Sequence, residues 1–263
     1  PRSTLFPYTT LFRSDLYMNC SDAMCAVLKR YSPLIQRYSI DECFLDYTAS
    51  EGRWGDPLQT AHRIRAQIRE ELGFTVNVGV SSNKLLAKMA SELEKPDRVH
   101  TLYPREIEAK MWPLPVSELF MVGRATSARL TAINVRTIGD LAAMDRGQLR
   151  DMFKSYGERI WQYANGIDPS PVELNERIVQ KGIGNSMTVF YDVTDRREIL
   201  AYLLSLCERT ASRLRAMKAR ASLVSVWFRT DAFVSRQHQR RLSCYTDQTS
   251  EIYRTAALLM DEC

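Results

Sequence analysis

A chain of 263 residues, 45% hydrophobic and 25% charged, has the composition of an ordinary soluble globular protein and is long enough to bury one large core or several small ones. It lacks any apolar run of about eighteen residues, which excludes a membrane-spanning helix, and its first residues lack the pattern of a secretory signal peptide. The net charge of +5 is modest, but seven basic residues lie between Arg215 and Arg241, opposed there only by Asp231. Such a stretch favours a polyanion such as nucleic acid, although a solvated face explains it as well.

The six cysteines are widely scattered and include no Cys-x-x-Cys pair. Reduced thiols explain this spacing better than a disulfide framework or a zinc site does. We therefore expect a cytoplasmic protein.

Residues 1–14 contain a near repeat, Thr4-Leu5-Phe6 and Thr10-Leu11-Phe12, and show neither helix caps nor a clean period. The segment resembles translated sequencing-adapter sequence, which occurs at the ends of some assembled reading frames. We expect residues 1–14 to be non-native and exclude them from fold reasoning.

Helices and strands alternate over the first hundred residues. We expect a short helix over 22–30, strand character from 34 to 47, a helix from 57 to 72, a strand over 74–80, a helix that starts after Asn83, and a short strand over 99–103. The arginines of the second helix, Arg63, Arg65 and Arg69, are expected on its solvated face. This order predicts an α+β layer.

The prolines Pro113 and Pro115 mark a boundary, after which the chain is helical and short-linked up to Pro169 and Pro171. Beyond a linker we expect an extended segment over 183–193, a long helix that starts at Asp195, strands around 224–228 and 236–240, and a helix from about residue 249. That last helix has no C-cap and no strand after it, so we expect the chain to be truncated.

An adjacent carboxylate pair, Asp41 and Glu42, interrupts the strand-like run 38–47. On a regular strand neighbouring side chains point to opposite faces, so the two can share a ligand only at a hairpin tip or bulge. Two hard carboxylates placed there would bind Mg²⁺ and, with it, a triphosphate. An ordinary exposed turn explains the same residues, because short motifs often match by chance.

Three motifs follow one another in a fixed order: Ser39-Ile40-Asp41-Glu42, then Gly79 to Lys88, then Lys95-Pro96. This series resembles the palm of Y-family translesion DNA polymerases of the UmuC/DinB type. The resemblance continues through 123–141, similar to the family's helix-hairpin-helix-like thumb, and through 181–186 and beyond, similar to its little finger. It implies an α+β protein with a partial palm of mixed sheet and helices (15–112), a small all-α thumb (113–170), a linker (171–180) and an incomplete α+β little finger (181–263).

The resemblance also implies site residues. Asp41 and Glu42 match the paired catalytic carboxylates that bind Mg²⁺ in a two-metal mechanism, and Lys95 matches a lysine that contacts the incoming triphosphate. The candidates for contacts with the DNA backbone are Gly123, Arg124 and Thr126 in the thumb and Lys181, Arg229, Arg236 and Arg240 in the little finger.

Several of these residues have simpler explanations that stay open at this point. Gly123 is equally well explained as a glycine that ends a helix, and the arginines as part of an unremarkable surface strand. Lys84 and Lys88 are either ligand contacts or have a structural or solvated role, and Asp46 fits a strand end better than a metal ligand.

The implied activity is template-directed DNA synthesis past lesions, in DNA repair and the SOS response, in the bacterial cytoplasm at the nucleoid. Primer-template DNA and dNTP are the implied partners, with a sliding clamp for the full-length protein and no membrane. The family's third carboxylate lies on an early strand, and nothing in this sequence matches it, so we expect negligible polymerase activity from these 263 residues. The alternative is a non-catalytic DNA-binding protein that uses thumb and little finger only; a nucleotide cyclase with a related palm would lack both regions.

Overall fold

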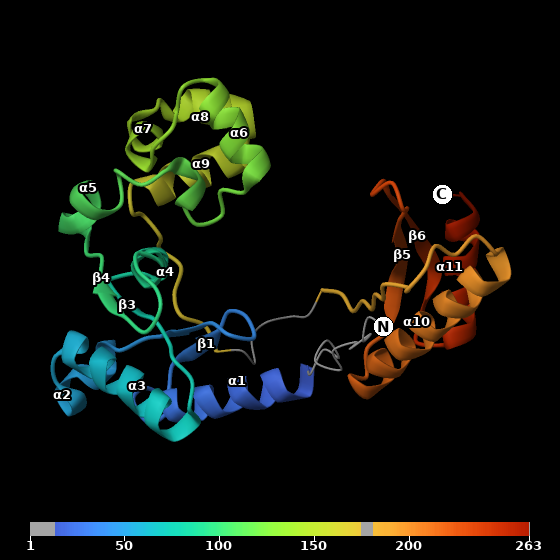
Figure 1. The fold of residues 1–263 in the computed structure, drawn as a ribbon, viewed down its shortest axis with the longest axis horizontal. Helices are drawn as coiled ribbons and strands as arrows, with labels where there is room; N and C mark the ends of the chain where they lie inside the picture. Colours follow the sequence, from blue (N-terminus) through green and yellow to red (C-terminus); the bar gives the residue numbers. More distant parts are fainter. Residues whose placement is uncertain (1–13, 175–180, 263) are drawn as a thin grey trace, which may run out of the picture. The chain divides into compact units, whose positions relative to one another are not determined.

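A computed structural model describes residues 14–174 and 181–262 (Figure 1). The chain divides into two compact units between residues 178 and 179, and each unit is described by itself. The segment expected to be non-native lies outside the described residues, except for Ser14, which begins the first helix. No helix in the described ranges is long and apolar enough to cross a membrane, and the five cysteines described there are free.

The first part of unit one alternates helices and short strands, as expected. Its elements are α1 (Ser14–Leu28), β1 (Ile35–Arg37), β2 (Cys43–Leu45), the 3-10 turn η2 (Thr48–Ser50), α2 (Glu51–Trp54), α3 (Pro57–Leu72), β3 (Val78–Val80), α4 (Lys84–Glu92) and β4 (Val99–Thr101). The first helix begins well before the expected residue 22, and the strand expected over 74–80 is confined to its last three residues. The α+β fold class is confirmed.

Helix α3 has the ends that its sequence predicts. The Asp56 carboxylate accepts a hydrogen bond from the Gln59 N–H at 2.8 Å, Pro57 occupies the first turn, and Gly73 ends the helix at a φ of 75°. Its apolar stripe, including Ile64 and Ile68, packs against α1 and β1 in a core that also contains Met24, Val27, Leu28, Tyr31 and Ile35. This core supports the β1–β2 hairpin from one side.

Of the α3 arginines expected on a solvated face, Arg63 and Arg69 are exposed and Arg65 is partly buried, and all three have side-chain contacts. Arg65 donates a hydrogen bond from Nη1 to the Asp97 carbonyl oxygen at 2.6 Å, and Arg69 Nη1 lies 3.0 Å from the Asp97 carboxylate. Arg63 lies over the Trp54 ring at 5.9 Å. Asp97 has a φ of 57°, a conformation that costs energy for a non-glycine residue, and the two arginines hold it there. Helix α3 therefore fixes the turn that carries Lys95.

The described strands form three separate two-stranded ladders. Strands β1 and β2 pair antiparallel through a hairpin, whereas β3 and β4 pair parallel because α4 connects them as a crossover helix. Glycine is required at 79, because a Cβ there would lie 1.9 Å from the Ala87 carbonyl oxygen of α4. Helix α4 thus lies unusually close to β3.

The second part of unit one is helical, as expected for the thumb-like region. It comprises the 3-10 turn η3 (Pro104–Glu106), α5 (Ile107–Lys110), the 3-10 turn η4 (Val116–Glu118), α6 (Arg124–Ala132), α7 (Ile138–Ala143), α8 (Arg146–Phe153) and α9 (Ser155–Ala164). Leu86 and Met89 of α4 share one core with Leu130, Leu149 and Ile160 of this helical part. A continuous core therefore crosses the boundary expected at residue 113.

Unit two contains α10 (Arg196–Ala216), β5 (Ala221–Arg229), β6 (Ser235–Thr246) and α11 (Thr249–Glu262), close to the expected order. Val224 and Val226 of β5 pack with Cys207, Ala211 and Leu214 of α10 and with Ile252, Ala256 and Leu259 of α11. The segment 183–193, expected to be extended, forms no strand. One face of the β5–β6 ladder is thus covered by helices.

The contact between β3 and α4 gives a first prediction. Gly79→Ala is expected to lower the free energy of unfolding by about 1–3 kcal/mol, because its new methyl group has to displace the backbone of α4. Gly52→Ala is the matched control, since a Cβ there meets nothing within 4 Å in a short helix. Urea unfolding followed by circular dichroism compares the two, and equal midpoints for both variants would contradict the close contact.

Candidate active site and nucleic-acid interface

The carboxylate pair lies in the loop of the β1–β2 hairpin. The N–H groups of Tyr38 and Ser39 donate to the Glu42 carbonyl oxygen at 2.8 and 3.2 Å, which closes the loop around Asp41. The Ser39 hydroxyl donates to Asp41 Oδ1 at 2.6 Å, and the Asp41 side chain is exposed. Because the loop interrupts the strand alternation, it meets the condition under which two adjacent carboxylates can face one ligand.

Four side chains of alternating charge connect this loop to the Lys95 turn. Lys88 Nζ of α4 lies 2.5 Å from Glu42 Oε1 and 2.8 Å from Glu92 Oε1, and Lys95 Nζ lies 2.6 Å from Glu92 Oε2. Lys88 is the least exposed member, at 15% for its side chain, and Lys95 the most exposed, at 52%. We call Glu42, Lys88, Glu92 and Lys95 the ion-pair chain.

Burial and ion pairing shift the pKa values of Lys88 and Glu92 in the ion-pair chain in opposite directions. Burial by itself lowers the pKa of Lys88, but the hydrogen bonds that Lys88 donates to Glu42 and Glu92 outweigh it, and the pKa lies above its ordinary value. Burial likewise raises the pKa of Glu92, and the hydrogen bonds from Lys88 and Lys95 outweigh it, so the pKa lies below its ordinary value. Both groups are therefore charged near neutral pH.

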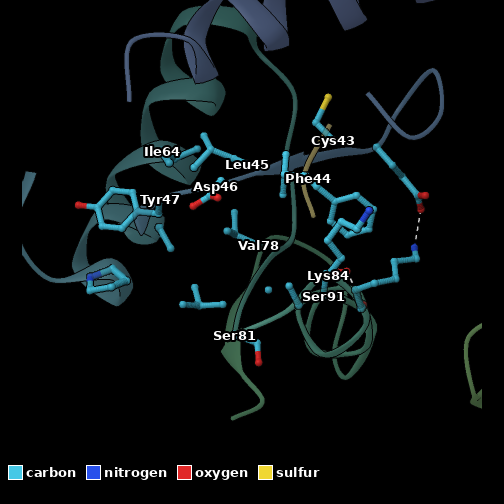
Figure 2. A pocket seen from close by; sticks show the side chains of 18 of the residues that line it. Cys43, Phe44, Leu45, Asp46, Tyr47, Ile64, Val78, Ser81, Lys84 and Ser91 are labelled. Atoms are coloured by element: carbon cyan, nitrogen blue, oxygen red, sulfur yellow. Dashed lines mark hydrogen bonds and ion pairs between the residues drawn. The ribbon is translucent and has the colours of Figure 1, made fainter. Parts of the chain in front are cut away.

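Lys84 is held in place rather than solvated. Its Nζ donates to Gln36 Oε1 of β1 at 3.1 Å and lies 5.7 Å from the centre of the Phe44 ring (Figure 2). Asn83 caps the start of α4 by accepting from the Leu86 N–H at 2.8 Å. Lys84 thus ties the first turn of α4 to the hairpin that carries the carboxylates.

A cavity of about 860 Å³ lies between β2, β3 and α4, and both carboxylates, Lys88 and Lys95 line it. Figure 2 shows Cys43, Phe44 and Leu45 of β2 across this cavity from Val78 of β3 and from Ser81, which follows that strand. The ladder bonds of β2 are made by its alternate residues, so the backbone groups of Cys43 and Leu45 point to the free edge. In β3 the same alternation frees the backbone groups of Gly79. Within residues 14–174 these edge groups have no ladder partner.

The chemistry of the donors suits Mg²⁺. This ion is usually held by one or two carboxylates, with water and substrate phosphates as its other ligands, and Asp41 and Glu42 supply two carboxylates. No group of three or more His, Cys, Asp or Glu side chains in the described ranges is arranged to hold a metal ion. Asp46 Oδ1 accepts from the Thr48 N–H at 2.9 Å, which assigns that carboxylate to the end of the strand.

Gly123 lies at the start of α6 and not at the end of a helix. Its φ of −81° and ψ of 174° are extended, and it is the N-cap residue of Arg124–Ala132. This excludes the explanation of Gly123 as a left-handed helix-ending glycine. Arg124 is exposed and Thr126 half-buried, so the first turn of α6 offers backbone N–H groups and a cation at the surface.

The structure divides the three little-finger arginines between two faces of the β5–β6 ladder. Arg229 pairs with Ser235 on the open face, where Trp227 is 51% exposed. Arg236 and Arg240 pair with Phe228 and Val224, on the face whose residues Val224 and Val226 the helices cover, although both arginines are themselves exposed. Arg240 is also ion-paired with Glu262 of α11. Lys181 is exposed, outside this ladder.

The open face contains residues that the sequence reasoning missed. The Arg229 guanidinium lies 5.4 Å from the centre of the Trp227 ring, and Gln237 donates to the Ser225 hydroxyl at 3.1 Å. The alternation that placed Val224, Val226 and Phe228 inside carried the signal, since it puts Leu223, Ser225, Trp227 and Arg229 outside. Their cross-strand partners are Arg241, Gln239, Gln237 and Ser235. This polar and aromatic surface is the candidate nucleic-acid interface.

Comparison with known proteins identifies the family. Residues 8–92 match the model of the impB/mucB/samB family, and residues 180–263 match the model of the same family's C-terminal domain. DNA polymerase IV of Clostridium acetobutylicum is 45% identical over 250 residues, which cover 95% of this chain and 63% of that protein. DNA polymerase IV of Moorella thermoacetica is 37% identical over 248 residues, covering 94% and 62%. The chain thus spans less than two thirds of the length of these relatives.

Solved structures agree on the fold. A Y-family DNA polymerase chimera matches with a TM-score of 0.83 at 23% identity, over 95% of this chain and 71% of the chimera. The insertion ternary complex of Dbh DNA polymerase matches with a TM-score of 0.59 at 23% identity, over 95% and 71%. Two models of one family together cover more than half of the residues. The chain therefore belongs to the impB/mucB/samB family of Y-family DNA polymerases.

Proposed function

We propose that the full-length protein is a DNA-directed DNA polymerase of the translesion type, which uses primer-template DNA, dNTP and Mg²⁺. The observation that carries this proposal is that the Asp41–Glu42 loop and the Lys95 turn, far apart in sequence, line one cavity. Carboxylates for a divalent cation and an ammonium for a triphosphate are the groups that nucleotidyl transfer needs. The polymerases among the relatives and structural neighbours support the same reaction.

The proposed roles follow from charge and position. Asp41 and Glu42 hold the divalent cation, which when bound neutralises the triphosphate and the attacking 3′-oxygen. Lys95, half-exposed at the rim of the cavity, contacts the phosphates and offsets negative charge as the pyrophosphate leaves. Lys84 keeps α4 against the hairpin and so sets the separation between the carboxylates and Lys95.

The free edges of β2 and β3 indicate where a strand that carries the family's third carboxylate would pair. Unpaired backbone groups of Cys43, Leu45 and Gly79 line the same cavity as the carboxylates. A strand that pairs with either edge would bring its side chains beside the hairpin loop. We expect the polymerase to need such a strand for its third carboxylate.

The DNA contacts proposed here are mainly contacts with the phosphate backbone. The first turn of α6, with Gly123, Arg124 and Thr126, suits a phosphate, because its N–H groups have no partner inside the helix. The open face of β5–β6 adds Arg229 for phosphate and Trp227 for stacking. Such contacts do not read the sequence, as a polymerase that copies any template requires.

The remaining parts of the proposal rest on the family. DNA repair in the SOS response, a cytoplasmic location at the nucleoid and a sliding clamp as partner are proposed from the family resemblance alone.

A primer-extension assay tests the catalytic assignment. With Mg²⁺ and dNTP the 263-residue chain is expected to show negligible incorporation, whereas a longer version that includes the family's early strand extends the primer. In that longer protein, Asp41→Asn and Glu42→Gln should each lower the rate by at least about a hundredfold, as expected when a metal ligand of the transition state is lost. Wild-type rates in both variants, or strong incorporation by the 263-residue chain, would refute the assignment.

Two arginines on opposite faces of one hairpin test the DNA interface. Arg229→Ala is expected to weaken binding to primer-template DNA and to reduce the salt slope of log K by about one, the loss of one phosphate contact. Arg236→Ala, with the same change of charge on the helix-covered face, should leave the slope unchanged. Fluorescence anisotropy between about 50 and 200 mM salt measures both. A lower slope for Arg236→Ala alone would place the interface on the other face.

A further inference from the structure

In the ion-pair chain, Glu42 and Lys95, which the proposed function assigns to the metal ion and the triphosphate, are already paired with other side chains. Glu42 is paired with Lys88 at 2.5 Å, and Lys95 is paired with Glu92 at 2.6 Å. A metal ion at Glu42 competes with the Lys88 ammonium, and a phosphate at Lys95 competes with the Glu92 carboxylate. Each ligand therefore meets a group that one ion pair of the ion-pair chain already engages.

Glu92 occupies the central position in this competition. Its two oxygens take different partners, with Oε1 on Lys88 and Oε2 on Lys95. Lys88 and Glu92 are four residues apart on α4 and lie side by side on one helix face, so their pair does not depend on the hairpin loop. If Glu42 leaves Lys88, Glu92 still neutralises that half-buried ammonium.

We propose that Glu92 is a positioning residue with two opposite effects: it holds Lys88 so that Glu42 can turn to the metal ion, and it restrains Lys95 until a triphosphate displaces it. This inference rests on the proposed function, because it takes Glu42 and Lys95 as the groups that meet the ligands. Glu92 lines the same cavity, with both of its carboxylate oxygens on the two lysines. Its contribution acts through the two lysines.

The opposite signs make the proposal testable on the 263-residue chain without turnover. In Glu92→Gln, Lys95 loses its competing carboxylate, so affinity for inorganic tripolyphosphate in the absence of metal is expected to rise about two- to fivefold. In the same variant Lys88 has Glu42 as its remaining carboxylate partner, so Glu42 is less free to bind a metal ion. Affinity for Mn²⁺, which like Mg²⁺ prefers oxygen ligands, is therefore expected to fall by a similar factor. Isothermal calorimetry measures the first constant and the EPR signal of free Mn²⁺ the second.

Glu94→Gln is the matched control. Glu94 lies two residues further along and pairs with Arg98 at 3.1 Å and with His100 at 3.7 Å, away from Lys88 and Lys95. The Glu94→Gln substitution removes the same charge from the same segment as Glu92→Gln, so any effect of net charge alone appears in both variants. Circular dichroism melts of both variants establish that each one is folded before binding is compared.

The possible outcomes separate the two proposals. Tighter tripolyphosphate binding with weaker Mn²⁺ binding in Glu92→Gln, and neither change of that size in Glu94→Gln, supports the positioning role. Equal changes in the two variants, or changes of the same sign for both ligands, overturn it. If the unsubstituted chain binds Mn²⁺ and tripolyphosphate no better than a chain that carries Asp41→Asn, Glu42→Gln and Lys95→Met, the assignment of the site itself fails instead.

Discussion

The close approach of α4 to β3 is the constraint on which the candidate site depends. It exists because residue 79 has no side chain, so the Ala87 carbonyl of α4 comes within 1.9 Å of where a Cβ would be. The buried side of α4, with Leu85, Leu86 and Met89, then enters the core of the helical part of unit one. Its other side is left facing the cavity with Lys84 and Lys88. Core packing thus decides which lysines meet the hairpin loop.

A second constraint fixes the other end of the site. The turn after α4 contains Asp97 in a left-handed conformation, which two arginines of α3 stabilise through its carboxylate and its carbonyl oxygen. Lys95 is two residues away, so the same clamp sets where its flexible side chain starts. Helix α3 in turn shares its core with the β1–β2 hairpin. The carboxylate loop and the turn that carries Lys95 are therefore both positioned by α3, which determines how far apart they lie.

Sequence reasoning predicted local features well, because caps, glycines and periodicity act over a few residues. Asp56 and Gly73 bound α3, and Asn83 caps α4, as their sequence positions indicate. It did not identify partners that are distant in sequence: Lys88 lies 46 residues from Glu42, and Arg69 lies 28 from Asp97. A lysine or arginine on a helix face reads as solvated until its distant partner is known.

The β5–β6 ladder shows a different reason for an incomplete prediction. The alternation of β5 was visible in the sequence, but the face on which an arginine of β6 lies depends on the strand register, and a shift of one residue reverses it. The register here pairs Arg240 with Val224 and Arg241 with Leu223. Arg241, not Arg240, consequently shares the open face with Trp227 and Arg229. Where phosphate contacts of unit two depend on this face, they are determined by strand pairing more than by the number of basic residues in the segment.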